Sequence, residues 1–177
     1  MKYCGGPGIK NGSAYKLDGE GSGTVTPDPD PADDAQFKAV SAITSGKKYA
    51  LVADGKLAVS FGTKTYGYMS VSDVSISDNA FTGNADNSFT FTQVDGGYTI
   101  QGNDGRYVYM TGTYNSFNLD ASQPATGAVW SVTFSDGKAT ITNIEMNKSI
   151  QFDPQYNSYG SYPDERGTFP TLYELVD

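Results

Sequence analysis

Alternating apolar and polar positions predict short β-strands, separated by turns, over residues 36–177. In one of the clearest stretches Val108 and Met110 are two residues apart, and side chains with that spacing lie on the same face of a strand. We therefore expect these two side chains to face the core. Tyr107 and Tyr109 alternate with them, and we expect both tyrosines to be at least partly exposed on the opposite face.

The chain repeats a pattern over about 30 positions. The first copy contains Phe89-x-Phe91-x-x-x-Asp95-Gly96-x-x-Thr99-Ile100, and the second contains Trp130-x-Val132-x-x-x-Asp136-Gly137-x-x-Thr140-Ile141, 41 positions later. With one residue inserted, the match continues at an offset of 42, from Gly105–Met110 to Asn147–Phe152 and from Tyr114-Asn115-Ser116-Phe117 to Tyr156-Asn157-Ser158-Tyr159. The core-facing positions remain apolar in the second copy, as Ile150 and Phe152, whereas Ser149 and Gln151 replace the two tyrosines on the other face.

A weaker third copy precedes these two. Phe37 stands where Phe89 and Trp130 stand. Thr65-Tyr66-Gly67-Tyr68 is a degenerate version of the pattern Tyr-Asn-Ser-aromatic seen in the other two copies, which we call the aromatic phrase. Residues 72–87 make this copy longer than the others, and we expect them to form a loop.

The three copies together predict the fold. Asp-Gly pairs between alternating strands are strong hairpin signals. Three units of about 40–50 residues, each with about four short strands, predict an all-β, β-trefoil-like domain in which three units close around a shared core. A β-sandwich is the alternative if the weakest copy is not a true repeat. We expect one end of the core to be filled by Phe37, Phe89 and Trp130, with Ile100, Ile141, Val132, Leu51 and Tyr49 beside them.

The beginning of the chain differs from the main domain, which we place at residues 36–177. Residues 1–19 predict two short strands around a Gly/Pro/Asn turn, and two strands are too few to form a core of their own. Residues 20–35, EGSGTVTPDPDPADDA, predict a flexible Asp/Pro linker. An extended Asp-Pro run does not bring its carboxylates to one point as a calcium site requires, so no metal site is predicted there.

The acidic composition narrows the classes of partner. The net charge is −8 and the sequence pI is about 4.4, so nucleic acid and anionic membrane surfaces would be repelled. The sequence contains no apolar run of about 18 residues, so we expect no membrane insertion by this chain.

Catalytic chemistry is also restricted. The chain has no histidine, which removes the commonest general base and metal ligand, and its single cysteine, Cys4, lies outside the main domain. Catalysis would need paired carboxylates, but most acidic residues of the domain lie in predicted turns. The one dense charged cluster of the last unit is Asp164-Glu165-Arg166, in which we expect Arg166 to pair with its neighbours. We predict no catalytic residue, no metal and no cofactor, and we do not expect an enzyme.

Tyrosines are abundant, with 13 in the chain, and tyrosine rings stack on sugar faces while neighbouring amides bind the hydroxyls. The predicted ligand-binding residues are Tyr107, Tyr109, Tyr114 and Asn115, with Tyr66 and Tyr68 forming an equivalent site. Tyr114 and Tyr156 have two interpretations, and a structural role at the end of each unit is favoured over a role as a repeated ligand platform. A site in the last unit should be weaker or absent, because Ser149 and Gln151 replace the tyrosines there.

The C-terminal stretch carries a resemblance. Residues 143–175, NIEMNKSIQFDPQYNSYGSYPDERGTFPTLYEL, resemble the end of a β-rich module of secreted and cell-surface proteins of gut Bacteroidales. Earlier parts of that module resemble Tyr66–Val71, Tyr98–Gln101 and Gly105–Asn118, so the resemblance covers nearly all of residues 37–175. It implies an extracellular or cell-surface location and an architecture, and it carries over no catalytic residue. The opening KYCGGPGIKNGSAYKLDG resembles the tail of an OB-like module, which implies that residues 1–19 are a remnant of an upstream domain.

These observations predict a non-catalytic extracellular binding module. The favoured function is carbohydrate binding through surface tyrosines. The alternative is a structural spacer or a protein–protein interaction module of a larger surface protein, in which the exposed tyrosines contact another protein. The expected partner is therefore a glycan or another surface protein.

Overall fold

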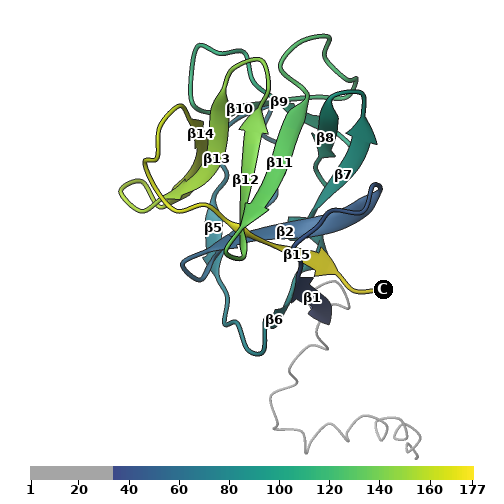
Figure 1. Ribbon diagram of the computed structural model, residues 1–177, viewed down its shortest axis with the longest axis vertical. Coiled ribbons are helices and arrows are strands. Elements are labelled where there is room, and N and C mark those ends of the chain that lie inside the picture. Colours follow the sequence, from purple (N-terminus) through teal and green to yellow (C-terminus); the bar gives the residue numbers. More distant parts are fainter. Residues whose placement is uncertain (1–33) are drawn as a thin grey trace, which may run out of the picture.

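The computed structural model describes residues 34–177, which form an all-β domain (Figure 1). The predicted strand pair at residues 1–19 and nearly all of the predicted linker lie outside the described residues. The strands are β1 (Ala35–Ala39), β2 (Lys47–Ala53), β3 (Lys56–Ala58), β4 (Tyr66–Gly67), β5 (Val71–Asp73), β6 (Ala80–Gly83), β7 (Phe89–Val94), β8 (Gly97–Gln101), β9 (Tyr107–Tyr109), β10 (Phe117–Asp120), β11 (Trp130–Ser135), β12 (Lys138–Asn143), β13 (Lys148–Asp153), β14 (Ser158–Tyr162) and β15 (Thr171–Leu175), with one 3₁₀ turn at Ala85–Asn87. Over residues 34–177 the chain forms no helix with the length and hydrophobicity that a bilayer crossing requires.

Six strands close into a barrel. Three antiparallel pairs, β15 with β2, β7 with β8 and β11 with β12, are joined side by side because β2 also pairs with β7 and β8 with β11. The ring closes between β12 and β15, where the backbone N–H of Ala139 donates to the carbonyl oxygen of Pro170 over 2.7 Å. Figure 1 shows β11 and β12 running together, with β15 crossing near the lower end of β12.

Two of the strand pairs are joined by two-residue turns. Asp136 and Gly137 join β11 to β12 with φ values of 50° and 77°, the left-handed conformation that a two-residue hairpin loop requires. Asp54 and Gly55 adopt the same conformation between β2 and β3, with φ values of 52° and 73°. The predicted Asp-Gly hairpin in the last unit is therefore confirmed.

A second set of strand pairs closes one end of the barrel. The fourth segment of each unit, which is the segment that carries the aromatic phrase, meets the other two there. The strand pairs are β3 with β5, β9 with β10 and β13 with β14. Met69 and Tyr159 exchange backbone hydrogen bonds of 3.1 and 2.9 Å, the N–H of Ser161 donates to the carbonyl of Asn115 over 2.8 Å, and β4 pairs with β10. Three four-stranded units around a common axis form the predicted β-trefoil, and the sandwich alternative is set aside.

The core repeats with the units. Paired residues at matching positions of the three barrel strand pairs pack in its interior: Phe91 with Ile100, Val132 with Ile141, and Leu172 with Leu51, of which Val132 is partly buried. Val108, Met110, Ile150 and Phe152 are buried as predicted, and the indole N–H of Trp130 donates to the carbonyl of Val108 over 3.1 Å.

One part of the predicted repeat is wrong. Phe37 does not take the place equivalent to Phe89 and Trp130, because β15 takes that barrel position and β1 pairs with the outer edge of β15. Phe37 instead joins a second apolar cluster, where its ring stacks on Phe81 with 4.7 Å between centroids. Residues 72–87 are also more than a loop, since they supply β6, which pairs with β1.

Candidate functional site

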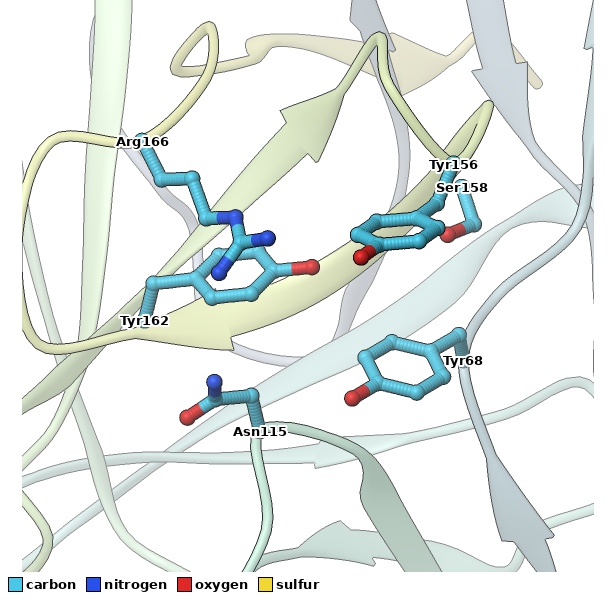
Figure 2. Close-up of a pocket in the computed structure, with 6 residues that line it drawn as sticks. All are labelled: Tyr68, Asn115, Tyr156, Ser158, Tyr162 and Arg166. Carbon is cyan, nitrogen blue, oxygen red and sulfur yellow. The ribbon is translucent and has the colours of Figure 1, made fainter.

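A pocket of about 450 Å³ opens where the fourth segments of the three units meet (Figure 2). Its lining residues come from all three units, and we call it the tyrosine pocket: Tyr68 from the first unit, Asn115 from the second, and Tyr156, Ser158, Tyr162 and Arg166 from the third. The backbone bonds between Met69 and Tyr159 and between Ser161 and Asn115 hold these segments together beneath the side chains. The pocket is therefore a product of the three-fold assembly, because a single unit supplies only part of it.

Strand β14 forms the floor by alternation. Ser158, Gly160 and Tyr162 share its pocket face, while Tyr159 and Ser161 between them are fully buried. Gly160 leaves the space that the rings enclose, since a Cβ atom there would lie 2.6 Å from the Tyr162 hydroxyl oxygen and 2.9 Å from Cε1 of Tyr68.

The Tyr162 hydroxyl is available to a ligand. Tyr162 is only 4% exposed, yet no residue in the described part of the chain hydrogen-bonds its hydroxyl, which Figure 2 shows pointing into the pocket toward Tyr156. Burial raises the pKa of Tyr162 to about 12, with a smaller effect in the same direction from Asp153. The hydroxyl therefore keeps its proton at neutral pH and can donate a hydrogen bond.

Arg166 forms one side of the pocket. Its Nε donates to Oδ2 of Asp153 over 2.8 Å, and its guanidinium carbon lies 5.1 Å from the ring centre of Tyr162 and 5.6 Å from that of Tyr156, within the range of cation–π contacts. The Asp153 hydrogen bond raises the pKa of Arg166, so the guanidinium is charged. The prediction that Arg166 pairs with Asp164 and Glu165 is wrong, because it pairs with Asp153, 13 positions earlier.

The loop that carries Arg166 is fixed by a buried amide. The side-chain oxygen of Gln151 accepts the backbone N–H groups of Arg166 and Gly167 at 2.7 and 2.9 Å, and its amide nitrogen donates to the carbonyl of Asp164 over 2.8 Å. Strand alternation predicts Gln151 on the exposed face, and this is wrong because the loop covers it. Gly167 is required as well, since a Cβ there would lie 1.9 Å from the carbonyl oxygen of Phe152.

The structure brings only some of the six predicted binding residues together. Tyr68 and Asn115 line the tyrosine pocket. Tyr66 and Tyr109 flank Asn118 on adjacent strands β4, β10 and β9, forming a row on the outer face that we call the outer tyrosine row. The remaining two, Tyr107 and Tyr114, also lie outside the pocket lining, and Tyr107 and Tyr109 are partly exposed as predicted.

The favoured structural role for Tyr114 and Tyr156 is wrong. Their side chains are 70% and 62% exposed, whereas the last aromatic residue of each phrase, Phe117 and Tyr159, is completely buried. The Tyr159 hydroxyl donates to the carbonyl of Lys56 over 2.6 Å and ties the last unit to the first. The first aromatic of the phrase is therefore free for binding, and in Tyr156 it lines the pocket.

Sequence reasoning did not assign Ser158, Tyr162 and Arg166 to a site. A signal for the first two was present, because Ser158, Gly160 and Tyr162 alternate in β14 with the buried Tyr159. Arg166 carries no such signal, since its position depends on the buried Gln151 and Asp153.

Among the described residues, no metal site lies beside the pocket. Within residues 34–177, His, Cys, Asp and Glu side chains do not gather in a group of three that could hold a metal ion. Of the six residues that line the pocket, none is acidic.

No protein-family model matches the chain, and no curated protein does. Two solved structures are similar in fold. A GlcNAcα1-4Gal releasing endo-β-galactosidase from Clostridium perfringens superposes with a TM-score of 0.56 at 21% identity, over 74% of this chain and 33% of that chain, so this chain spans about a third of the enzyme. A designed 3-fold symmetric protein, ThreeFoil, superposes with a TM-score of 0.52 at 17% identity, over 73% of this chain and 98% of that chain. At these identities the likeness shows the fold alone, a β-trefoil with internal three-fold symmetry.

Proposed function

We propose that this chain is a non-catalytic carbohydrate-binding module that holds a sugar in the tyrosine pocket. The observation that carries the proposal is the convergence of Tyr68, Tyr156 and Tyr162 on one hollow, beside the Asn115 amide and the Ser158 hydroxyl. Sugars combine apolar C–H faces with a ring of hydroxyls, so they suit a site that combines aromatic faces with hydrogen-bonding groups.

The size of the pocket supports a small ligand unit. At about 450 Å³ it lies in the lower part of the range for small-molecule sites, about 300–1,000 Å³. This volume suits one or two sugar residues, with the rest of a longer glycan passing over the exposed rings of Tyr68 and Tyr156.

The structural neighbours give limited support. The neighbour from Clostridium perfringens is an endo-β-galactosidase, so it acts on a carbohydrate, but the likeness to this chain is one of fold. The support for sugar binding therefore comes from the chemistry of the pocket.

The proposal assigns no catalysis to the pocket. Hydrolysis of a glycosidic bond needs two carboxyl groups, about 5–10 Å apart, on either side of the scissile bond. Asp153, whose carboxylate contacts the pocket residue Arg166, is buried and engaged by Arg166 and by the backbone N–H of Gln155. Incubation with oligosaccharides should release no new reducing ends, and release that is lost with Asp153→Asn would contradict this assignment.

The proposed location is the cell exterior. It rests on the resemblance of residues 143–175 to modules of secreted and cell-surface Bacteroidales proteins. Antibody labelling of intact cells of the source organism, compared with permeabilised cells, would test it directly.

A broad glycan array followed by titration calorimetry tests the binding proposal. We expect Tyr156→Ala and Tyr68→Ala each to weaken binding about tenfold or more, because each removes a stacking face. Tyr114→Ala is the matched control, since Tyr114 begins the equivalent phrase of the second unit but does not line the pocket. The proposal fails if the wild type binds no glycan, or if both pocket variants bind as well as Tyr114→Ala.

A second candidate, a protein–protein interaction module, is favoured by the outer tyrosine row. Tyr66 is 70% exposed, and exposed tyrosines are enriched in protein interfaces. The same variants separate the two candidates. Loss of a partner protein with Tyr66→Ala and Tyr109→Ala, together with unchanged binding in Tyr156→Ala, would support this second function.

A further inference from the structure

The outer edge of the Arg166 guanidinium is not used by the described part of the chain. Nε is bound to Asp153, but within residues 34–177 neither Nη atom has a hydrogen-bond partner. Because Gln151 fixes the backbone of residues 166 and 167, and two tyrosine rings flank the guanidinium, this edge is held in position before any ligand arrives. A planar edge with two N–H donors matches the two oxygens of a carboxylate.

The Tyr162 hydroxyl is a second donor without a partner in the described chain. This hydroxyl faces the open pocket, so a ligand acceptor placed there would gain a hydrogen bond that the protein itself does not supply. Tyr162 lies under the Arg166 guanidinium, and an acceptor placed between the two groups would be shared by them.

The charge of the pocket differs from that of the molecule. The chain carries a net charge of −8, yet Arg166 is the one charged residue among the six that line the pocket. Asp153 offers no hydrogen-bond acceptor to a ligand, because it is 3% exposed and its two oxygens accept from Arg166 and from the N–H of Gln155. The Nη donors of Arg166 therefore meet a pocket lining without carboxylates, which favours a ligand that brings its own anionic acceptor.

We propose that the tyrosine pocket binds an acidic sugar, with the carboxylate of the ligand accepting hydrogen bonds from the Nη atoms of Arg166 and the hydroxyl of Tyr162. This inference rests on the proposed function and names the class of sugar. Uronic acids and sialic acids both present a carboxylate on a sugar ring, so the experiment includes one of each.

Matched pairs of ligands measure how much the carboxylate of the sugar contributes to binding. The probes are trigalacturonic acid and sialyllactose, each compared by calorimetry with its methyl ester, which keeps the shape and removes the charge. We expect at least one acid to bind, and its ester to bind about tenfold more weakly or worse. Affinity for the acid should also fall as NaCl is raised from about 50 to 500 mM, because salt screens the charge of an open site.

Variants of Tyr162 and Arg166 then test whether these two residues bind the carboxylate of the ligand. Tyr162→Phe keeps the ring and should reduce the acid-to-ester preference without loss of stability, because no described residue bonds the hydroxyl. Arg166→Gln leaves Asp153 without its cation, so we pair it with Arg166→Gln/Asp153→Asn, which removes both charges. Both variants should lose the preference, and Arg166→Lys should retain only part of it, because lysine lacks the planar pair of donors.

The outcomes distinguish the two proposals. If acid and ester bind equally and Tyr156→Ala removes both, the pocket binds glycans but the acidic-sugar inference is overturned. If sulfated sugars bind and carboxylated sugars do not, the inference is overturned in favour of sulfate. If none of these sugars and no other glycan binds, the proposed function falls and the inference falls with it.

Discussion

The carboxylate of Asp153 lies buried beneath the guanidinium of Arg166, with 2.8 Å between Oδ2 and Nε. The two partners are unequal, because the Asp153 side chain is 3% exposed and that of Arg166 is 40% exposed. Removing Arg166, the exposed partner, leaves a buried charge without its counterion. Removing Asp153, the buried partner, leaves a cation that water can solvate.

This asymmetry predicts different costs for the two halves of the pair. Arg166→Gln should lower the free energy of unfolding more than Asp153→Asn does, because only the first leaves a buried charge without its partner. Urea denaturation of the two single variants and the double variant measures both losses and the coupling between them. Equal losses in the single variants would show that the carboxylate is not held in a buried environment.

Two glycines near the pocket predict opposite outcomes. In Gly160→Ala the added methyl meets the ends of the Tyr162 and Tyr68 side chains, so the rings shift into the pocket and ligand binding is lost while the domain stays folded. In Gly167→Ala the methyl meets the backbone of Phe152, which cannot move away, and stability should fall by about 3 kcal/mol. Thermal unfolding and glycan titration of the two variants separate the effects, and a folded Gly160→Ala that binds normally would contradict the proposed pocket.

The repeated aromatic phrase predicts a third contrast, within the second unit. Phe117→Ala removes a completely buried ring and should cost about 3–5 kcal/mol. Tyr114→Ala, three residues earlier, removes a ring that is 70% exposed and should change stability by less than about 0.5 kcal/mol. Chemical denaturation of both variants tests this assignment, which is opposite to the one favoured from the sequence.

The repeat itself could be predicted from the sequence, because the Asp-Gly hairpins and the alternation around Val108 are local signals that recur at a constant spacing. The position of Phe37 could not be predicted in this way. Its assignment assumed that the units follow one another along the chain, whereas the barrel takes its strand beside β2 from β15. That choice depends on pairing over more than 100 positions, which local periodicity does not report.

The pocket was predictable only in part for the same reason. Tyr68 and Asn115 were assigned because they belong to the aromatic phrases. Gln151 was assigned to the exposed face because alternation identifies the two faces of a strand, but it does not indicate when a later loop covers the outer face. Arg166 reaches the pocket through that same loop, so its role follows from tertiary contacts alone.

Alkaline pH should destabilise the domain. Burial raises the pKa of Tyr162 to about 12 and also raises the pKa values of Tyr159, Tyr173 and Tyr49. Tyrosines of the unfolded chain lose their protons near about pH 10, so above that pH the native state holds protons that the unfolded state has released. The stabilisation is complete below about pH 10 and is lost as the pH rises through the native-state pKa values.

Urea denaturation from pH 6 to 11 measures this loss. Between about pH 6 and 8 stability should be constant, since the chain contains no histidine. Tyr162→Phe should reduce the loss above about pH 10, and Tyr114→Phe serves as an exposed control. A profile for Tyr162→Phe that is the same as that of the wild type would show that this hydroxyl does not titrate with folding.

The position of β15 has a consequence for synthesis of the chain. The strand is made after every other strand of the barrel, yet it lies between β2, an early strand, and β12. Until residues 171–175 have left the ribosome, β2 and β12 each present an open edge to which a neighbouring nascent chain could add a strand. The first unit therefore waits for the synthesis of residues 171–175 to complete its pair of barrel strands, and the interval before β15 emerges is when the domain is most exposed to aggregation.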